Sequence, residues 1–179
     1  MGKKLESLTP ELFSFIEKQK IFFVGTAASE GTVNLSPKGM DALRIIDPNR
    51  VVWLNLTGSG NETAAHLLQF NRMTIMFCAF EGPPLILRLY GKAELVHTED
   101  EQWGSYRALF PEYHGARQII DMKIDLVQTS CGFGVPNYEY IGDRDTLEKW
   151  AEKKGEQGIR EYWQEKNKTS LDGLPTDII

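Results

Sequence analysis

The sequence predicts a mainly β fold of the α+β class, in which antiparallel strands form a barrel and helices pack outside it. Two pairs of strand-like segments are each joined by a short turn, which favours antiparallel pairing. Residues 85–95 alternate between apolar and polar side chains, and a strand of this length commonly curls around a barrel, which removes exposed sheet edges. With 179 residues, 41% of them hydrophobic, the chain is expected to form one domain over residues 1–179.

The first half of the chain is expected to contain one helix and two hairpins. A helix start is indicated at Thr9, whose hydroxyl can cap the helix and which is followed by proline and glutamate. Segments 21–28 and 31–37 are rich in β-branched or aromatic residues and flank a Ser-Glu-Gly turn, so they are predicted to form a hairpin. Segments 42–46 and 50–56 flank Asp-Pro-Asn and predict a second one.

The second half is expected to combine longer strands with helices. Residues 72–80 are apolar on both faces, which is typical of a strand buried on both sides. In the strand at 85–95, the leucines at 85, 87, 89 and 95 share one face. A last strand is predicted at 123–133, and helices are predicted at 62–69, 99–109, 115–121 and 145–167. The final helix is a charged extension, with its tryptophans in the core and its other face solvated, outside a domain core at about 8–140.

The composition argues against several classes of partner. Lys and Arg total 20 against 25 Asp and Glu, a net charge of −5, so nucleic acid or an anionic membrane is not an expected partner. The N-terminus lacks the apolar stretch of a signal peptide and no apolar run is long enough to span a bilayer, so a cytoplasmic protein is expected. The two cysteines are expected to stay free, and the three histidines show no metal-ligand spacing, so no metal site is expected.

The sequence TGSGNET at residues 57–63 follows a strand and precedes a helix, which predicts an anion-binding loop. Free backbone N–H groups and the positive end of the helix dipole face the same space, and glycines allow close approach. One alternative is that Ser59 and Glu62 form a capping box that satisfies the helix by itself. Another is a dinucleotide-binding fingerprint with Glu81 on the ribose, although its third glycine is replaced by Thr63.

Several motifs in order identify a family resemblance: NLSPKG, VVWLNLTGSGNETAAHL, NRMTIMFCAF and LILRLYGKAEL. From about residue 8 to residue 140, the chain resembles the pyridoxamine 5'-phosphate oxidase-like family of FMN-binding split β-barrels. The resemblance implies an antiparallel split β-barrel with peripheral helices. It also implies a homodimer that binds two FMN molecules at the subunit interface.

The resemblance also implies which residues contact the cofactor. The flavin ring would border Ser36, Pro37, Lys38 and Gly39, and the ribityl phosphate would lie among Ser59, Gly60, Asn61, Glu62 and Thr63. The oxidases of the family generally carry an Arg-Lys pair where this chain has Glu62 and Thr63. The positive charge is therefore expected from Lys38 or Arg88, because neutral donors alone hold a phosphate weakly. An ordinary salt bridge is the alternative role of Arg88.

A second set of candidate contacts lies in SCGFGVPNY at residues 130–138. In the family, the late strand approaches the flavin of the partner subunit, so Cys131 and Phe133 would cover the second side of the ring. The alternative is a turn with an inert cysteine.

The expected function is FMN-dependent oxidation or reduction of an unidentified small molecule, with no obvious catalytic residue. The C-terminus LDGLPTDII lacks the basic, aromatic segment of the true oxidases, which argues against vitamin B6 as the substrate. Two alternatives remain open. One is a non-catalytic flavin carrier or redox sensor, and the other is a split barrel that holds haem or a deazaflavin.

Overall fold

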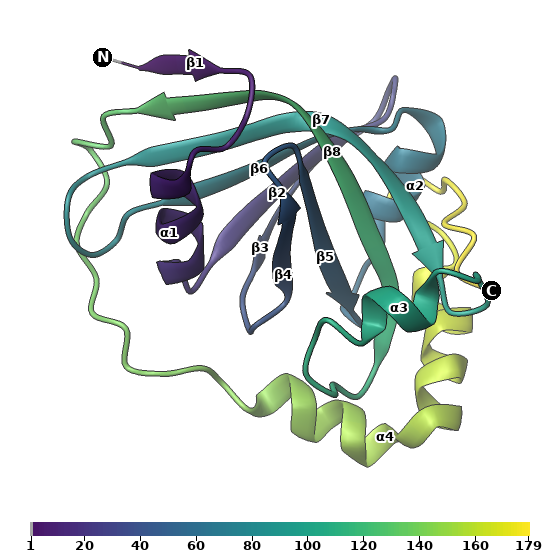
Figure 1. The fold of residues 1–179 in the computed structure, drawn as a ribbon. Coiled ribbons are helices and arrows are strands. Elements are labelled where there is room, and N and C mark those ends of the chain that lie inside the picture. Colours follow the sequence, from purple (N-terminus) through teal and green to yellow (C-terminus); the bar gives the residue numbers. More distant parts are fainter. Residues whose placement is uncertain (1) are drawn as a thin grey trace.

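A computed structural model of the chain describes residues 2–179 and contains one antiparallel sheet that curls into a split barrel (Figure 1). The sheet has the order β3-β2-β6-β7-β8-β5-β4, and β1 pairs with β8 outside this path. Its strands are β1 (Lys3–Leu5), β2 (Phe22–Ala27), β3 (Val33–Lys38), β4 (Leu43–Asp47), β5 (Arg50–Leu56), β6 (Arg72–Cys78), β7 (Ile86–His97) and β8 (Ala116–Ser130). The helical elements are α1 (Pro10–Lys18), α2 (Glu62–Gln69), α3 (Trp103–Arg107), α4 (Thr146–Tyr162) and the π-helical turn η1 (Trp163–Asn167). The predicted fold class is confirmed.

Both predicted hairpins form. β2 pairs with β3, so that Phe22 lies opposite Lys38, and β4 pairs with β5. The first helix also begins where the sequence indicated, since the Thr9 hydroxyl accepts a hydrogen bond from the Leu12 N–H at 3.4 Å and proline occupies the first helical position. Local turn and capping chemistry therefore determines the first half of the fold.

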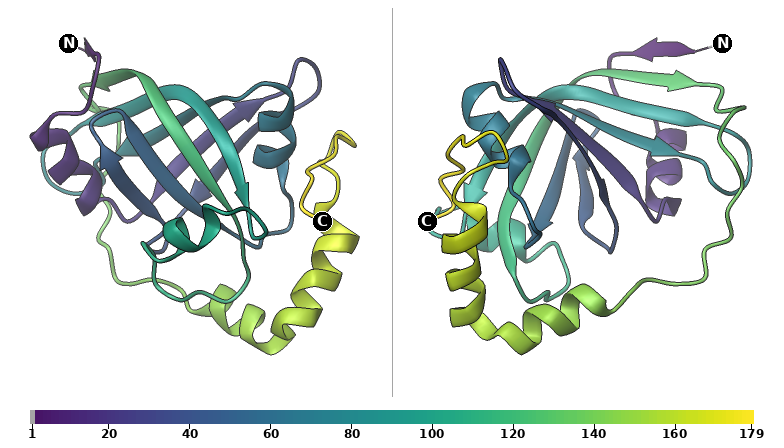
Figure 2. Two further views of the ribbon diagram at one scale, coloured as in Figure 1. Left: turned by 45° about the vertical axis from the view of Figure 1, so that its right-hand side comes forward. Right: turned by 180° about the vertical axis from the view of Figure 1, so that it is seen from behind.

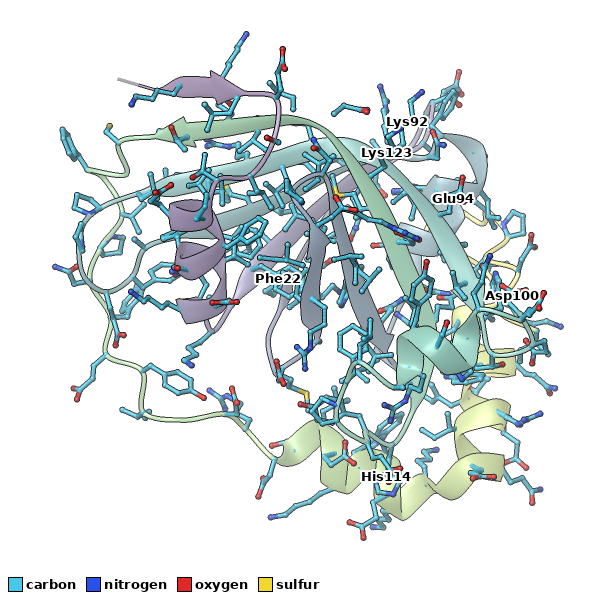
Figure 3. The ribbon with its side chains drawn as sticks, viewed as in Figure 1. Phe22, Lys92, Glu94, Asp100, His114 and Lys123 are labelled. Atoms are coloured by element: carbon cyan, nitrogen blue, oxygen red, sulfur yellow. The ribbon has the colours of Figure 1, made fainter. Side chains whose placement is uncertain are left out.

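The core fills the interior of the barrel and is closed at one end by α1. Alternate side chains of β2, β6 and β7 point inward, and Phe22 packs edge-on against Trp53 with their ring centroids 6.2 Å apart. Figure 3 shows Phe22 inside the barrel near α1, and Lys92, Glu94 and Lys123 on the opposite, outer side of β7 and β8. Burial of one face of each strand provides most of the free energy that holds the sheet closed.

The helix predicted at 115–121 is wrong, because these residues begin the long strand β8. β8 pairs with β5 along one edge and with β7 along the other, and Ile119 and Ile120 are both fully buried. A segment this short, with two adjacent apolar residues, fits either a helix or a central strand, and long-range pairing decides between them. The helix predicted at 99–109 is confirmed only as α3, and the short strand β1 was not predicted.

β7 shows the predicted alternation as far as Ala93, with Leu87 and Leu89 fully buried. The register to β8 shifts between Tyr90 and Gly91, and beyond this irregularity Val96 is buried rather than Leu95. Such a bulge bends the strand and increases its twist, which helps the sheet to curl.

The chain returns to the barrel through its C-terminal segment. α4 is interrupted at Gly155, whose φ of 65° turns the helix, and η1 and the following residues then run back toward α2 (Figure 2). The predicted helical extension is confirmed in outline. Trp163 is buried as predicted and the opposite face is exposed, but Asn167 is also fully buried, which the pattern did not predict. Among residues 2–179, no helix combines the length and apolar character needed to cross a bilayer.

Candidate functional site

A cavity of about 620 Å³ lies at the N-terminus of α2, between β3, β5 and the C-terminal segment. The loop 57–61 forms its floor because β5 ends at Leu56 and α2 begins at Glu62. The five residues predicted around the phosphate all line this cavity: Ser59, Gly60, Asn61, Glu62 and Thr63. Two of the residues predicted beside the flavin ring, Ser36 and Lys38, line it as well.

The N-terminus of α2 is not capped by a side chain. Asn61 is the N-cap residue and makes no capping hydrogen bond, and the predicted capping box of Ser59 and Glu62 is wrong. The Glu62 carboxylate instead accepts hydrogen bonds from the Leu171 N–H at 3.0 and 3.1 Å. The first N–H groups of the helix therefore retain their capacity to bind an anion.

Three buried polar atoms around the cavity have no hydrogen-bond partner among the described residues. They are the Ser36 Oγ, the Asn61 Nδ2 and the Arg117 Nε. The two nitrogens can only donate, and a hydroxyl donates readily. An unsatisfied buried donor costs about 1–3 kcal/mol, so a set of them around one cavity indicates a ligand that accepts hydrogen bonds.

Two cations, Lys38 and Arg117, supply the positive charge of the cavity. Among residues 2–179, neither forms an ion pair with a carboxylate. Burial, together with the charge of Arg117, lowers the pKa of Lys38 to about 8. The Lys38 ammonium also lies over the Trp53 ring, 4.9 Å from its centroid. Glu62, Glu165 and Lys166 also line the cavity. Lys38 and Arg117 therefore leave it with two cations that are not held in ion pairs, as a phosphate requires.

Arg117 was missed by the sequence analysis. It is 5% exposed, and its guanidinium donates to the Asn167 Oδ1 at 2.9 Å and to the Asn55 Oδ1 at 3.3 Å. Burial lowers the pKa of Arg117, and Tyr162 and Glu62 oppose this effect, yet an arginine keeps its charge at neutral pH. The wrong helix at 115–121 concealed this residue, because a strand there places it beside β5 and the loop.

The remaining predicted site residues lie elsewhere in the single chain. Arg88, on β7, donates to the Ser130 Oγ at 3.2 Å and does not line the cavity. Gly39 lines a neighbouring, mainly apolar cavity of about 670 Å³, and Pro37 lies on the exposed side of β3. Cys131 is exposed, as is Phe133 at 82%. Contacts of Arg88, Cys131 and Phe133 with a flavin require a second chain and stay predictions.

The alternative of a dinucleotide-binding fingerprint is wrong. α2 joins β5 to β6, and these strands are separated in the sheet by β7 and β8. All strand pairs are antiparallel, whereas the fingerprint needs adjacent parallel strands.

The histidines lie apart from one another. The Nδ1 of His66 is 3.1 Å from the Thr26 Oγ1, and His114 contacts Glu148 of α4 (Figure 3).

Comparison with known proteins identifies the family. The family model described as pyridoxamine 5'-phosphate oxidase matches residues 8–131. The pyridoxamine 5'-phosphate oxidase family protein ustO of Aspergillus flavus is 36% identical over 188 residues, covering 95% of this chain and 76% of the relative. HupZ of Group A Streptococcus has the same fold, with a TM-score of 0.53 at 20% identity over 66% of this chain and 91% of its own. HutZ, the haem storage protein of Vibrio cholerae, matches with a TM-score of 0.50 at 17% identity over 66% and 92% of the two chains. The chain belongs to the pyridoxamine 5'-phosphate oxidase family.

Proposed function

We propose that this protein binds FMN, with the ribityl phosphate in the cavity at the N-terminus of α2, and acts as an FMN-dependent oxidoreductase on a small molecule. Proteins of the family commonly bind a flavin, and some bind haem. The observation that carries the proposal is the set of buried donors without partners, on Ser36, Asn61 and Arg117, around a cavity with two unpaired cations.

The residues present fit a phosphate without the Arg-Lys pair of the oxidases. Lys38 and Arg117 replace that pair from β3 and β8, and the helix N-terminus adds its N–H groups. The negative charge of Glu62 is opposed by the backbone N–H of Leu171, to which both carboxylate oxygens are bonded. The anion site is therefore rebuilt from different elements of the same fold.

The proposal includes a homodimer with the cofactor at the interface. β3 is an edge strand of the sheet, and its Val33 and Leu35 are 76% and 68% exposed. The family resemblance implies that in such a dimer Cys131 and Phe133 of one chain approach the ring held by the other. Burying these apolar side chains provides the driving force for association.

When bound, FMN supplies the hydride or electron transfer, and the protein supplies position and electrostatics. Lys38 is the residue of this chain best placed to act on the flavin as well as on its phosphate. It lies on the SPKG segment, which the family resemblance places beside the ring, and it reaches the cavity from there.

The proposal is tested by the colour and turnover of the purified protein. Flavin absorbance after reconstitution with FMN, with a preference for FMN over riboflavin, is the expected result. Bleaching by NADPH or NADH and recovery in air would establish an oxidoreductase, whereas stable binding without turnover would indicate a carrier or sensor. An intense haem band after incubation with haem, with no affinity for flavin, would contradict the proposal.

The affinity for FMN is expected to fall as the pH rises from 7 to 9. The charged form of Lys38 attracts the phosphate, and in the free protein this form is lost as the pH passes its pKa of about 8. The dissociation constant is therefore expected to rise by up to about tenfold per pH unit above that pKa. Fluorescence titration of FMN at several pH values measures it.

Two variants at the same position provide the control for this dependence. Lys38→Arg keeps the charge and should bind FMN equally well at pH 7 and 9. Lys38→Met should bind weakly at both. A wild-type dissociation constant that is constant between pH 7 and 9 would exclude Lys38 as a phosphate ligand.

A further inference from the structure

The C-terminal segment Trp163–Asp172 packs over the loop that forms the cavity floor, more than 100 positions away in the chain. The Trp163 Nε1 donates to the Thr57 Oγ1 at 2.8 Å, and the Asn167 Nδ2 donates to the Gly58 carbonyl oxygen at 3.1 Å. The Asp172 carboxylate accepts from the Thr32 N–H at 2.8 Å, next to β3. Figure 2 shows this segment beside α2 in both views. The segment therefore forms a wall of the cavity supplied by the same chain.

Glu62 is one of the residues that hold this wall in place. It occupies a position where the family's oxidases carry a cation, and its carboxylate is bonded to the Leu171 N–H. In this chain Glu62 thus serves as an attachment point for the C-terminal segment. This connects the two departures from the oxidase pattern, one in the loop and one at the C-terminus.

Asn167 connects the segment to the cation of the cavity. It is fully buried, its Oδ1 accepts from Arg117 at 2.9 Å, and its backbone carbonyl accepts from the Thr176 hydroxyl. An amide oxygen orients the guanidinium without cancelling its charge, whereas a carboxylate at this position would form an ion pair with it. The Arg117 Nε is left without a partner among the described residues. The charge and one donor therefore remain available to a ligand.

We propose that Asn167 is a positioning residue that orients Arg117 toward the phosphate of the cofactor. Recognition of the phosphate therefore depends on the C-terminal segment. This inference rests on the proposed FMN site. The neutral side chain of Asn167 sets the preference of the site for a phosphorylated flavin.

The test compares the binding of FMN and riboflavin, which differ only in the phosphate, to the wild type and to Asn167→Asp. Asn167→Asp is expected to weaken FMN binding about tenfold or more, because the new carboxylate neutralises Arg117, while riboflavin affinity stays within about twofold. Asn167→Leu, which keeps the branched shape and loses the hydrogen bond, is expected to weaken FMN binding less. Gln164→Glu adds the same charge on an exposed residue of the same turn and is the matched control, with no expected change.

Equal losses for FMN and riboflavin, or no loss for either, would overturn the inference, because a merely structural role does not discriminate between the two flavins. If the wild type binds neither flavin, the proposed function fails, and calorimetry with inorganic phosphate tests the positioning role separately. Weaker phosphate binding by Asn167→Asp than by the wild type would then support the role of Asn167. Equal binding, or no phosphate binding by the wild type, would overturn it.

Discussion

Arg117→Met is expected to weaken FMN binding by roughly 10- to 150-fold, while riboflavin binding changes little. Hydrogen bonds from a charged donor are worth about 1.5–3 kcal/mol, which corresponds to that range of affinity. Methionine fills most of the space of the buried side chain, so the principal loss is the cation. Fluorescence titration of both flavins measures the effect, and a thermal unfolding scan checks that the barrel remains folded.

Arg88→Met provides the matched comparison, because the sequence alone offered Arg88 as a source of the phosphate's counter-charge. Arg88 is bonded to Ser130 and lies outside the cavity, so its loss is expected to leave the ratio of FMN to riboflavin affinity unchanged. Arg117→Lys should restore part of the FMN affinity, since a point charge replaces a fork of donors. The reverse pattern, with Arg88 decisive and Arg117 neutral, would place the phosphate elsewhere.

The fold was predictable wherever short-range chemistry specifies it. The two hairpins depend on turns of a few residues, and the start of α1 depends on Thr9 and the proline that follows it. β8 was not predictable in the same way. Its first residues acquire strand geometry from two partners that lie far apart in the sequence, and the local pattern around Ile119 and Ile120 fits a helix equally well.

The site residues show the same difference between local motifs, which were predictable, and long-range contacts, which were not. The loop residues from Ser59 to Thr63 are contiguous, so one motif predicted their common location, and the hairpin brought Ser36 and Lys38 to it. Arg117 lines the cavity from a misassigned strand, and Asn167 is bonded to Arg117 from a C-terminal extension beyond the residues 8–131 that the family model matches. The orientation of Glu62 was also hidden, because its partner Leu171 lies 109 positions further along the chain. Local patterns predicted the floor of the cavity and one of its two cations, Lys38, and missed Arg117 and the C-terminal wall.

Gly91→Ala is expected to destabilise the protein by about 3 kcal/mol or more, or to prevent folding, because the change meets backbone rather than a mobile side chain. A Cβ atom at Gly91 would lie 1.9 Å from the carbonyl oxygen of Lys123 on β8. Relieving that clash requires the bulged pairing of β7 and β8 to open, at the point where the register shifts. Chemical unfolding followed by circular dichroism measures the loss.

Gly104→Ala is the matched control, since Gly104 lies in α3 and a Cβ atom there would meet no neighbouring atom within 4 Å. Alanine is favoured over glycine in a helix by up to about 1 kcal/mol, so this variant should be as stable as the wild type or slightly more so. The contrast between the two glycines isolates the close approach of β7 to β8 from the general effect of adding a methyl group. A Gly91→Ala protein with wild-type stability would mean that the two strands do not meet in this register. The curl that brings β8, and with it Arg117, to the cavity would then need another explanation.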